Sequence, residues 1–425
     1  MDTHVIMLDK YVHIIEKLNH ILFVLAVCML PYPTTFSLYA WGFWIIGWYL
    51  EGRFLSKANW QWHRRVVPLC MLAFWVVCEL LSYAWSIQKE ATFDLLVRHL
   101  SFVVILPIAF CGVNGRYNWK WAARCFVLSA TASVFVYGVY IYIVSQWDVL
   151  CSHAQLPDEV LSWTYFGEQI SSLKHRLYYG TVLNLAVIVL LKSRNFALSL
   201  HQETWKRTIS FFVCLCLLVL GIVLSGSRAN LLALLVVAMV SVIQPLRGRT
   251  RVWVASVASV LMLVLCVWVY SVHPRFEQLH VKPVAGQDFQ PSYEVEPRIN
   301  IWYSVQQTPR DYLWKGVGAG CNAEYLKPIY ASFHLDAFTA REFNSHNQYL
   351  GVLIDLGIIV AVFFLMIWLC YPFFYHGRWR EWVVLVVLLV GLNMMTENML
   401  ERIDGVIMIC CALLSIALLA RTFKS

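Results

Sequence analysis

The sequence predicts an all-α, polytopic integral membrane protein with about twelve transmembrane helices. Hydrophobic residues make up 60% of the 425 residues and charged residues only 14%, whereas soluble domains average about half apolar and a quarter charged. Twelve spans of ~20 residues would use roughly 240 residues, a little over half of such a chain. This composition excludes an ordinary soluble enzyme, an intrinsically disordered chain and a small disulfide scaffold.

The candidate spans are apolar runs separated by polar connections. Five of them precede the first long polar connection, near residues 21–30 (extended back to Val12), 36–50, 66–85, 93–113 and 122–145. Four more follow, near 177–191, 208–224, 228–243 and 252–272. The last three lie near 346–374, 382–395 and 405–420.

Lys and Arg are concentrated in alternate connections and at both termini, as at Arg53, Arg65, Lys120, Arg249 and Arg378. The positive-inside rule therefore predicts that these connections and both termini face the cytoplasm, which agrees with an even number of spans. The net charge of +8 follows from the same loops, so it predicts no nucleic-acid partner.

Two long polar connections, 146–176 and 274–345, lie on the opposite, extracytoplasmic side in this topology. We expect spans 1–9 in residues 1–273, one large outer loop in 274–345, and spans 10–12 in 346–425. Long loops usually carry function or structure of their own. Within the large loop we expect a helix near Arg298–Gln307 and a tight turn at Gly316–Gly320. A disulfide between Cys151 and Cys321, one in each connection, is left open.

Arg228 is the most conspicuous charged residue, because an ionisable group in an apolar run costs about 3 kcal/mol or more at mid-bilayer unless it is solvated or paired. It follows Ser225, Gly226 and Ser227 in a hinge between two apolar runs. Unpaired backbone amides beside an Arg at a helix start favour an anion. The alternative is that Arg228 snorkels to the membrane interface.

Arg298 and His346 lie toward the end of the large loop. Arg298 follows Pro297 at a helix start, and taken alone it is better interpreted as a solvated surface residue. His346 opens an apolar run at the outer boundary, where we expect Ser345 to cap the helix. Imidazole can accept a proton near neutrality; the alternative is an interfacial histidine without a chemical role.

Other charged residues have simpler interpretations. We expect an ion pair between Arg98 and Asp94, one helical turn apart, interface anchoring for Arg176, and structural packing for Asp355. The residues interpreted as a local charge network in the last outer connection are Glu397, Glu401, Arg402 and Asp404.

Motifs for metal and nucleotide binding are missing from the sequence. It contains no DxD, HExxH or Walker A pattern. Glu294 and Glu296 form the nearest acidic pair, which is a weak signal for a divalent metal. We therefore expect no metal and no other cofactor.

Three segments together resemble the O-antigen ligase and polymerase superfamily. They are SGSRANLLALLVV from Ser225, EPRINIWYSVQQTPRDYLWKGVGAG from Glu296 and SHNQYLGVLIDLGIIVAVFF from Ser345. Their order, their spacing and the large outer loop match that superfamily, from about Leu177 to the C-terminus. Asn230 departs from the pattern, because Gly or Ala is common at its position.

The resemblance implies a GT-C-like glycosyltransferase of the bacterial inner membrane. Such a ligase moves undecaprenyl-diphosphate-linked O-antigen to the lipid A–core oligosaccharide at the periplasmic face, among membrane lipids. Carried over by motif, Arg228 and Arg298 would hold the donor diphosphate and His346 would be the base. The candidates for supporting roles are Ser227, Asn347, Arg176 and Arg98.

The chemistry of these residues fits that reaction. Guanidinium groups offer permanently charged, bidentate donors to a diphosphate leaving group. A neutral His346 can take the proton of an acceptor hydroxyl during inverting attack on the anomeric carbon. Three alternatives stay open: an O-antigen polymerase, a protein-glycosylating ligase of the same superfamily, and a lipid-linked sugar flippase, which is not an enzyme. Clustering of the unusual charges at one face disfavours the flippase.

Overall fold

The computed structural model describes residues 2–115, 117–152, 163–192, 204–272 and 297–422. Within these ranges every regular element is a helix and no strand occurs, which confirms the all-α class. Among the same residues, 5 helical stretches are long and apolar enough to cross a membrane. They are Arg64–Ser82, Lys89–Cys111, Trp119–Val144, Gln348–Phe374 and Ile403–Arg421. The larger number of spans stays a prediction.

Each predicted apolar run coincides with a helix or with a closely spaced pair of helices. The helices are α1 (Asp2–Met29), α2 (Thr34–Leu50), α3 (Val67–Ser82), α4 (Lys89–Val104), α5 (Leu106–Cys111), α6 (Trp119–Ser152), α8 (Arg176–Lys192), α10 (Thr204–Leu224), α11 (Arg228–Ile243), α12 (Gly248–Val272), α16 (Gln348–Cys370), α17 (Gly377–Met394) and α18 (Ile403–Thr422).

The structure differs from the predicted elements in two places. The run 93–113 divides into α4 and α5 at Ile105, because Pro107 in the first turn of α5 has no amide to donate to the preceding turn. The expected loop 146–176 is also partly helical: α6 continues to Ser152, and α7 occupies Trp163–Leu173.

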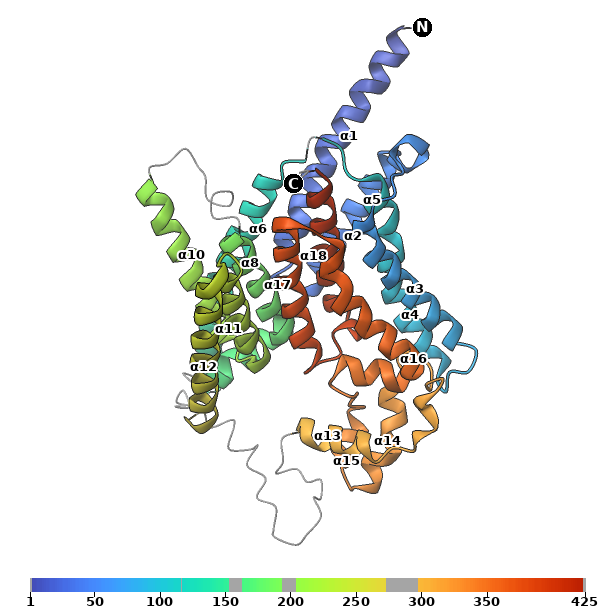
Figure 1. Cartoon of the computed structure of the whole chain (residues 1–425), viewed down its shortest axis with the longest axis vertical. Helices are drawn as coiled ribbons and strands as arrows, with labels where there is room; N and C mark the ends of the chain where they lie inside the picture. The colour runs from blue at the N-terminus through green and yellow to red at the C-terminus, as the bar shows by residue number, and fades with distance from the viewer. Residues whose placement is uncertain (1, 116, 153–162, 193–203, 273–296, 423–425) are drawn as a thin grey trace.

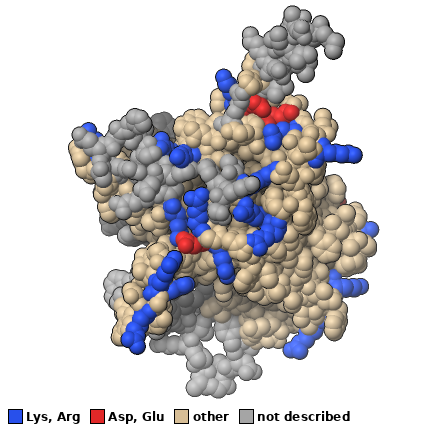
Figure 2. Space-filling model, turned by 45° about the horizontal axis from the view of Figure 1, so that its top comes forward, with Lys and Arg blue, Asp and Glu red and all other residues tan. Residues whose placement is uncertain are grey.

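The start of α1 and the end of α18 lie at the same end of the bundle (Figure 1). We call this end the terminal face. Basic side chains cluster there (Figure 2). Connections far apart in sequence meet at it: Lys192 pairs with Glu381 at 2.8 Å, and Gln244 donates to the Glu381 carbonyl at 3.2 Å. The other end, which carries α13, α14 and α15, we call the loop face (Figure 1).

Helix α8 is the most enclosed helix of the bundle. Every residue from Leu177 to Ile188 is buried, and α6, α10, α11 and α17 pack around it. Its apolar residues therefore do not form one stripe but cover the whole circumference, as expected for a helix without a lipid-facing side. The N-terminus of α8 points to the loop face, so residues near Arg176 are fixed by the core of the bundle.

The described part of the large loop forms a small helical layer on the loop face. It consists of α13 (Pro297–Gln306), a short 3-10 helix at Arg310–Leu313, α14 (Asn322–Ser332) and α15 (Asp336–Ala340). The helix expected near Arg298–Gln307 is thus confirmed. The layer has an apolar cluster of its own, which includes Ile301, Leu326 and Tyr330 and extends to Ile354 of α16. This cluster attaches the layer to the membrane bundle.

The tight turn expected at Gly316–Gly320 is present, and it fits the layer closely against α16. The Val317 amide donates to the Ile354 carbonyl at 3.0 Å and the Gly318 amide to the Asp355 carbonyl at 2.9 Å. Gly316 has a φ of 71°, and a Cβ there would lie 2.2 Å from the Asp355 carbonyl oxygen. Asp355 Oδ2 accepts from the Gly320 amide at 3.0 Å. Asp355 therefore has the structural role expected of it.

Across the same contact, Gly357 interrupts the helical geometry of α16 with φ 80° and ψ 174°. A Cβ at Gly357 would lie 2.4 Å from the Trp314 carbonyl oxygen.

Cys321 is a buried, free thiol whose Sγ lies 3.3 Å from Ser86 Oγ. It forms no disulfide, and the side chain of Cys151 lies outside the described residues.

Candidate functional site

Arg228 is the first residue of α11, directly after the hinge that ends α10. Gly226 has a φ of 64°, and Ser227 occupies the N-cap position with extended backbone angles. Ser225 Oγ donates to the Ile222 carbonyl at 2.7 Å, which closes the last turn of α10. The hinge thus places the half-buried Arg228 beside the open amides of a helix N-terminus.

Asn230 attaches this hinge to the N-terminus of α8. Its Nδ2 donates to the Leu177 carbonyl at 2.8 Å and to Ser227 Oγ at 3.0 Å, and its Oδ1 accepts from Thr181 Oγ1 at 3.1 Å. Asn230 is fully buried. The residue that departs from the superfamily pattern is therefore a structural link, and Ser227 participates in the same link.

His175 and Lys174 precede α8 and lie among charged residues of the last outer connection. Lys174 Nζ pairs with Asp404 Oδ1 at 2.7 Å and donates to the Tyr32 carbonyl at 3.0 Å. Burial lowers the pKa of Lys174, and the nearby charge of Asp404 only partly reverses this. Burial, partly offset by the charge of Glu397, lowers the pKa of His175 to about 4. At neutral pH the imidazole of His175 is therefore uncharged.

His346 makes the central contact of the loop face. Its Nδ1 lies 3.2 Å from Oε2 of Glu397, whose side chain is 5% exposed. The Phe343 ring packs edge-on against the imidazole, with centroids 5.5 Å apart. His346 has a φ of 44°, which is rare for a residue other than Gly. Its amide donates to Asn344 Oδ1 at 3.0 Å, a local contact that holds this conformation.

Glu397 is ionised in this environment. Burial raises the pKa of its carboxyl, but the hydrogen bond from His346 counteracts that effect. The charge of Arg402 acts in the same direction, and the pKa lies below its usual value. An ionised Glu397 accepts a hydrogen bond from Nδ1–H of His346. The Nε2 lone pair of His346 is then available to another proton.

The cap of α16 is Asn347, not Ser345 as the sequence predicts. Asn347 Oδ1 accepts from the amides of Tyr349 at 3.0 Å and Leu350 at 3.2 Å. Ser345 instead turns inward and donates to Asn398 Oδ1 at 3.1 Å. Both residue types are good caps, and the local sequence does not distinguish them. Asn347 thus orients the start of α16 beside His346.

Arg98 is connected to this region by its guanidinium, which donates to the Glu401 carbonyl. The expected ion pair with Asp94 is therefore wrong: the last outer connection lies close enough to offer Arg98 a backbone acceptor. The side chain of Glu401 accepts from Asn322 at 2.8 Å and from Asn344 at 2.7 Å. Glu401 thereby joins α14, the residues before His346 and the last outer connection.

Arg298 is in the first turn of α13, and α13 is attached to the segment that carries His346. Trp302 Nε1 donates to the Ser345 carbonyl at 3.2 Å. Residues four apart are neighbours on one helix face, so Arg298 lies on the face of α13 that Trp302 directs at Ser345. Arg298 itself is half-buried.

Contacts of the loop face thus connect the predicted site residues through shared neighbours. Trp302, four residues after Arg298, donates to the carbonyl of Ser345, the neighbour of His346, and Arg98 donates to the Glu401 carbonyl. Arg228 is linked through Asn230 to α8, where Arg176 and His175 precede Leu177. The charge of Glu397 acts on His175. All these segments lie at the loop face, away from both termini (Figure 1).

A buried pair that sequence reasoning missed lies between α3 and α4. His99 Nδ1 is 2.7 Å from Glu79 Oε2, both side chains are 1% exposed, and His99 Nε2 is 2.7 Å from the Leu400 carbonyl. Glu79 and His99 are ionisable residues inside two apolar runs, and this pattern could have indicated the pair. The pair fixes the last outer connection, two residues beyond Asn398, to the spans beneath it.

Metal ligands do not gather in the part of the chain that the structure describes: no group of three or more His, Cys, Asp or Glu side chains is placed to hold a metal there. The acidic pair of Glu294 and Glu296 lies outside the described residues.

The fold and the site define a helical membrane protein with a polar, charged site at one end of its bundle. Residues 211–365 match the family model described as O-antigen ligase. The matched segment contains the hinge with Arg228, Arg298 and its helix, and His346 with the start of α16. This match agrees with the resemblance seen in the three motifs: residues 211–365 are similar to the O-antigen ligase family. No curated protein gives a significant match.

Proposed function

We propose that this protein is an inverting, metal-independent O-antigen ligase. It would transfer O-antigen polysaccharide from undecaprenyl diphosphate to a sugar hydroxyl of lipid A–core. The observation that carries the proposal is the contact between His346 and the buried Glu397 within a loop face that also carries Arg228 and Arg298. The match of residues 211–365 to the O-antigen ligase family supports it.

His346 is the proposed base. With Nδ1–H donated to Glu397, the Nε2 lone pair accepts the proton of the acceptor hydroxyl as its oxygen attacks the anomeric carbon. The new glycosidic C–O bond forms while the bond from the anomeric carbon to the diphosphate oxygen breaks, which inverts the anomeric configuration. Glu397 orients the imidazole and stabilises the imidazolium that forms. Glu397 is thus a positioning residue.

Arg228 and Arg298 are the proposed diphosphate ligands. The leaving group departs as undecaprenyl diphosphate and carries the negative charge of the broken bond. Arg228 offers a guanidinium next to the amides of the α11 N-terminus, where an anion is favoured. Arg298 offers a second guanidinium from the first turn of α13. Fixed cations of this kind stabilise charge that develops in the transition state.

The proposed orientation places the loop face in the periplasm and both termini in the cytoplasm. Basic side chains clustered at the terminal face support it (Figure 2), because Lys and Arg favour the cytoplasmic side of the bacterial inner membrane. Polar glycan substrates would then be met in water on the loop face, while the isoprenoid tail stays among the membrane helices.

The second candidate is an O-antigen polymerase, which would use the same donor site and a second lipid-linked glycan as acceptor. The test is reconstitution of the purified protein in vesicles with lipid-linked polysaccharide and one acceptor at a time. Sugar gained by lipid A–core supports the ligase. Sugar gained only by the second lipid-linked chain supports the polymerase. Transbilayer movement of the donor without transfer to either acceptor would overturn both in favour of a flippase.

A further inference from the structure

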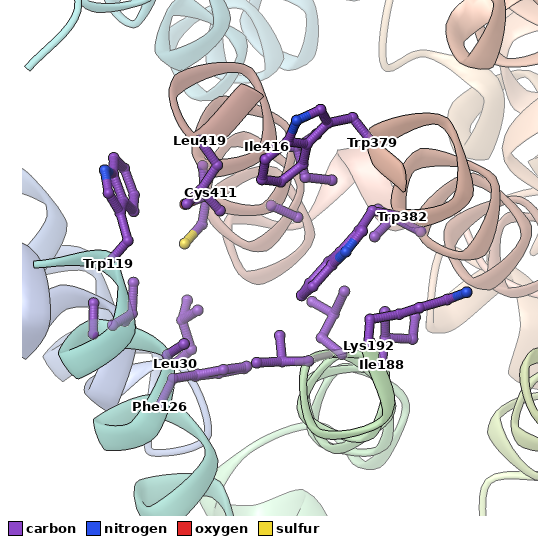
Figure 3. Close-up of a pocket in the computed structure, with 18 of the residues that line it drawn as sticks. Leu30, Trp119, Phe126, Ile188, Lys192, Trp379, Trp382, Cys411, Ile416 and Leu419 are labelled. Carbon is purple, nitrogen blue, oxygen red and sulfur yellow. The ribbon is translucent and has the colours of Figure 1, made fainter. Parts of the chain in front are cut away.

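A cavity of about 450 Å³ lies inside the bundle at the terminal face, remote from His346. Helices α1, α6, α8, α17 and α18 enclose it. Its walls are formed by apolar and aromatic side chains, with Phe126, Trp382 and Cys411 directed into the open space (Figure 3). The volume is in the range of roughly 300–1,000 Å³ that is typical of sites for small ligands.

The depth of the cavity corresponds to one leaflet of a bilayer. On α8 its wall extends from Leu185 to Lys192, a rise of ~10 Å, and on α18 from Met408 to Leu419, a rise of ~16 Å. The hydrocarbon core of a bilayer is ~30 Å thick. Leu30, directly after α1, also lines the cavity, which therefore starts at the terminal face and extends through at least half of that thickness.

The charged side chains that line this cavity lie at its mouth. Lys120 and Arg378 line it there, and the Arg378 guanidinium lies 5.0 Å from the centre of the Trp379 ring. Trp379 is 6% exposed, and within the described residues its Nε1–H has no hydrogen-bond partner. Lys192 contributes less positive charge to the mouth of the cavity. Its amine points away from the open space (Figure 3) and pairs with Glu381 at 2.8 Å.

This arrangement matches the chemistry of an anionic phospholipid. An apolar shaft one leaflet deep accommodates an acyl chain. Two cations at its mouth attract a phosphate, at roughly 1 kcal/mol for each basic residue near an anionic membrane surface. An indole N–H that lacks a protein acceptor offers a donor to a phosphate or ester oxygen, and a buried donor without any partner is unfavourable.

One other occupant fits less well. The lipid-linked donor would place its diphosphate at the opposite end of the bundle. A phosphate bound between Lys120 and Arg378 therefore cannot be that diphosphate.

We propose that this cavity is a binding site for an anionic diacyl phospholipid of the leaflet at the terminal face. One acyl chain occupies the shaft, and the headgroup phosphate lies between Lys120 and Arg378. The ligand class follows from the cavity itself and does not depend on the proposed transferase activity.

The test is photo-crosslinking in vesicles of phosphatidylcholine that contain phosphatidylglycerol with a diazirine on one acyl chain. The expected labels fall on peptides from 119–126 and 408–419, and unlabelled phosphatidylglycerol competes while phosphatidylcholine does not. Labelling by a neutral diazirine lipid to the same extent would overturn the proposal. So would competition by undecaprenyl phosphate but not by phosphatidylglycerol.

Two pairs of variants sharpen the test. Ser415→Trp fills the shaft, whereas Ser256→Trp adds the same bulk to an exposed position of α12. Lys120→Gln with Arg378→Gln removes the charges at the mouth, whereas Arg64→Gln with Arg380→Gln removes two exposed charges outside the cavity. Labelling of 408–419 should fall about tenfold or more in the first member of each pair only. Equal labelling in both members of the charge pair would refute the proposal even if Ser415→Trp does not fold.

Discussion

Glu397 and His346 are 51 residues apart in sequence, yet Oε2 of one lies 3.2 Å from Nδ1 of the other. The contact joins the start of α16 to the connection between α17 and α18. It fixes both the direction and the tautomer of the imidazole, because an ionised, buried carboxylate accepts only from a protonated nitrogen. The orientation of the His346 imidazole therefore depends on a residue outside the segment matched to the O-antigen ligase family.

Substitution His346→Ala should abolish glycan transfer, with a loss of about 10²-fold or more, because general base catalysis typically contributes 10²–10⁴-fold. Transfer of labelled polysaccharide to lipid A–core in vesicles measures it. The control is His334→Ala, which removes an exposed histidine of the same segment that also has a positive φ of 57°. Near-normal transfer by His346→Ala would remove this residue as the base.

Substitution Glu397→Gln should lower kcat by roughly 10–100-fold and leave KM for the donor nearly unchanged, because the amide keeps the shape but loses the charge that stabilises the imidazolium. Steady-state kinetics at fixed acceptor concentration separates the two constants. Glu397→Asp should recover part of kcat. An increase in KM without a change in kcat would instead indicate that Glu397 contributes to substrate binding only.

Substitutions Arg228→Lys and Arg298→Lys should each reduce transfer about tenfold or more, because Lys cannot provide the planar, bidentate donor pair of Arg. Arg310→Lys, in the short 3-10 helix of the large loop, is the matched control. Donor binding can be followed separately by displacement of a labelled polyprenyl diphosphate. If both variants keep full activity and affinity, diphosphate binding by these residues is wrong.

Treatment with a chelator should leave transfer intact, because the proposed mechanism assigns the charge of the leaving group to guanidinium groups. The measurement compares initial rates with and without EDTA, after dialysis of the vesicles. Complete loss that is restored by magnesium or manganese would contradict a metal-independent reaction and direct attention to Glu294 and Glu296.

Acid should destabilise the fold partly through His175. Its pKa is lowered from 6.5 to about 4, so between these values the unfolded chain binds more protons than the folded protein. Stability then rises with pH across this window and is lost as the pH falls from 6.5 toward 4. Thermal unfolding in detergent at a series of pH values should show a shallower dependence for His175→Gln than for the unchanged protein. The same slope in both would exclude His175 as a contributor; His334→Gln is the control.

The positions of the helices could be predicted from apolar runs because hydropathy is a local property of the sequence. The division of one run at Ile105 follows from Pro107 and was within reach of the same reasoning. The contacts of Arg98, Ser345 and Glu397 could not be predicted in this way. Each depends on which outer connections lie side by side, and that arrangement is set by packing between helices distant in sequence.

The candidate site shows the same division. Arg228 and His346 could be singled out because they are ionisable residues at the edges of apolar runs, and Arg298 because its segment resembles the superfamily motif. The surroundings of these residues could not be predicted. Trp302 connects α13 to Ser345, and Asn230 connects the hinge to Leu177, each by donating to a backbone carbonyl. Such contacts leave no pattern in a single sequence.

The interlocked glycines between the outer layer and α16 restrict how this protein can be recombined with its relatives. Gly316 lies against the Asp355 carbonyl, and Gly357 lies against the Trp314 carbonyl. A side chain at either glycine would therefore clash with the backbone of the facing segment. A chimera that exchanges the outer layer alone would bring together two surfaces shaped for different counterparts. The transplantable module is therefore the layer together with α16 through Gly357.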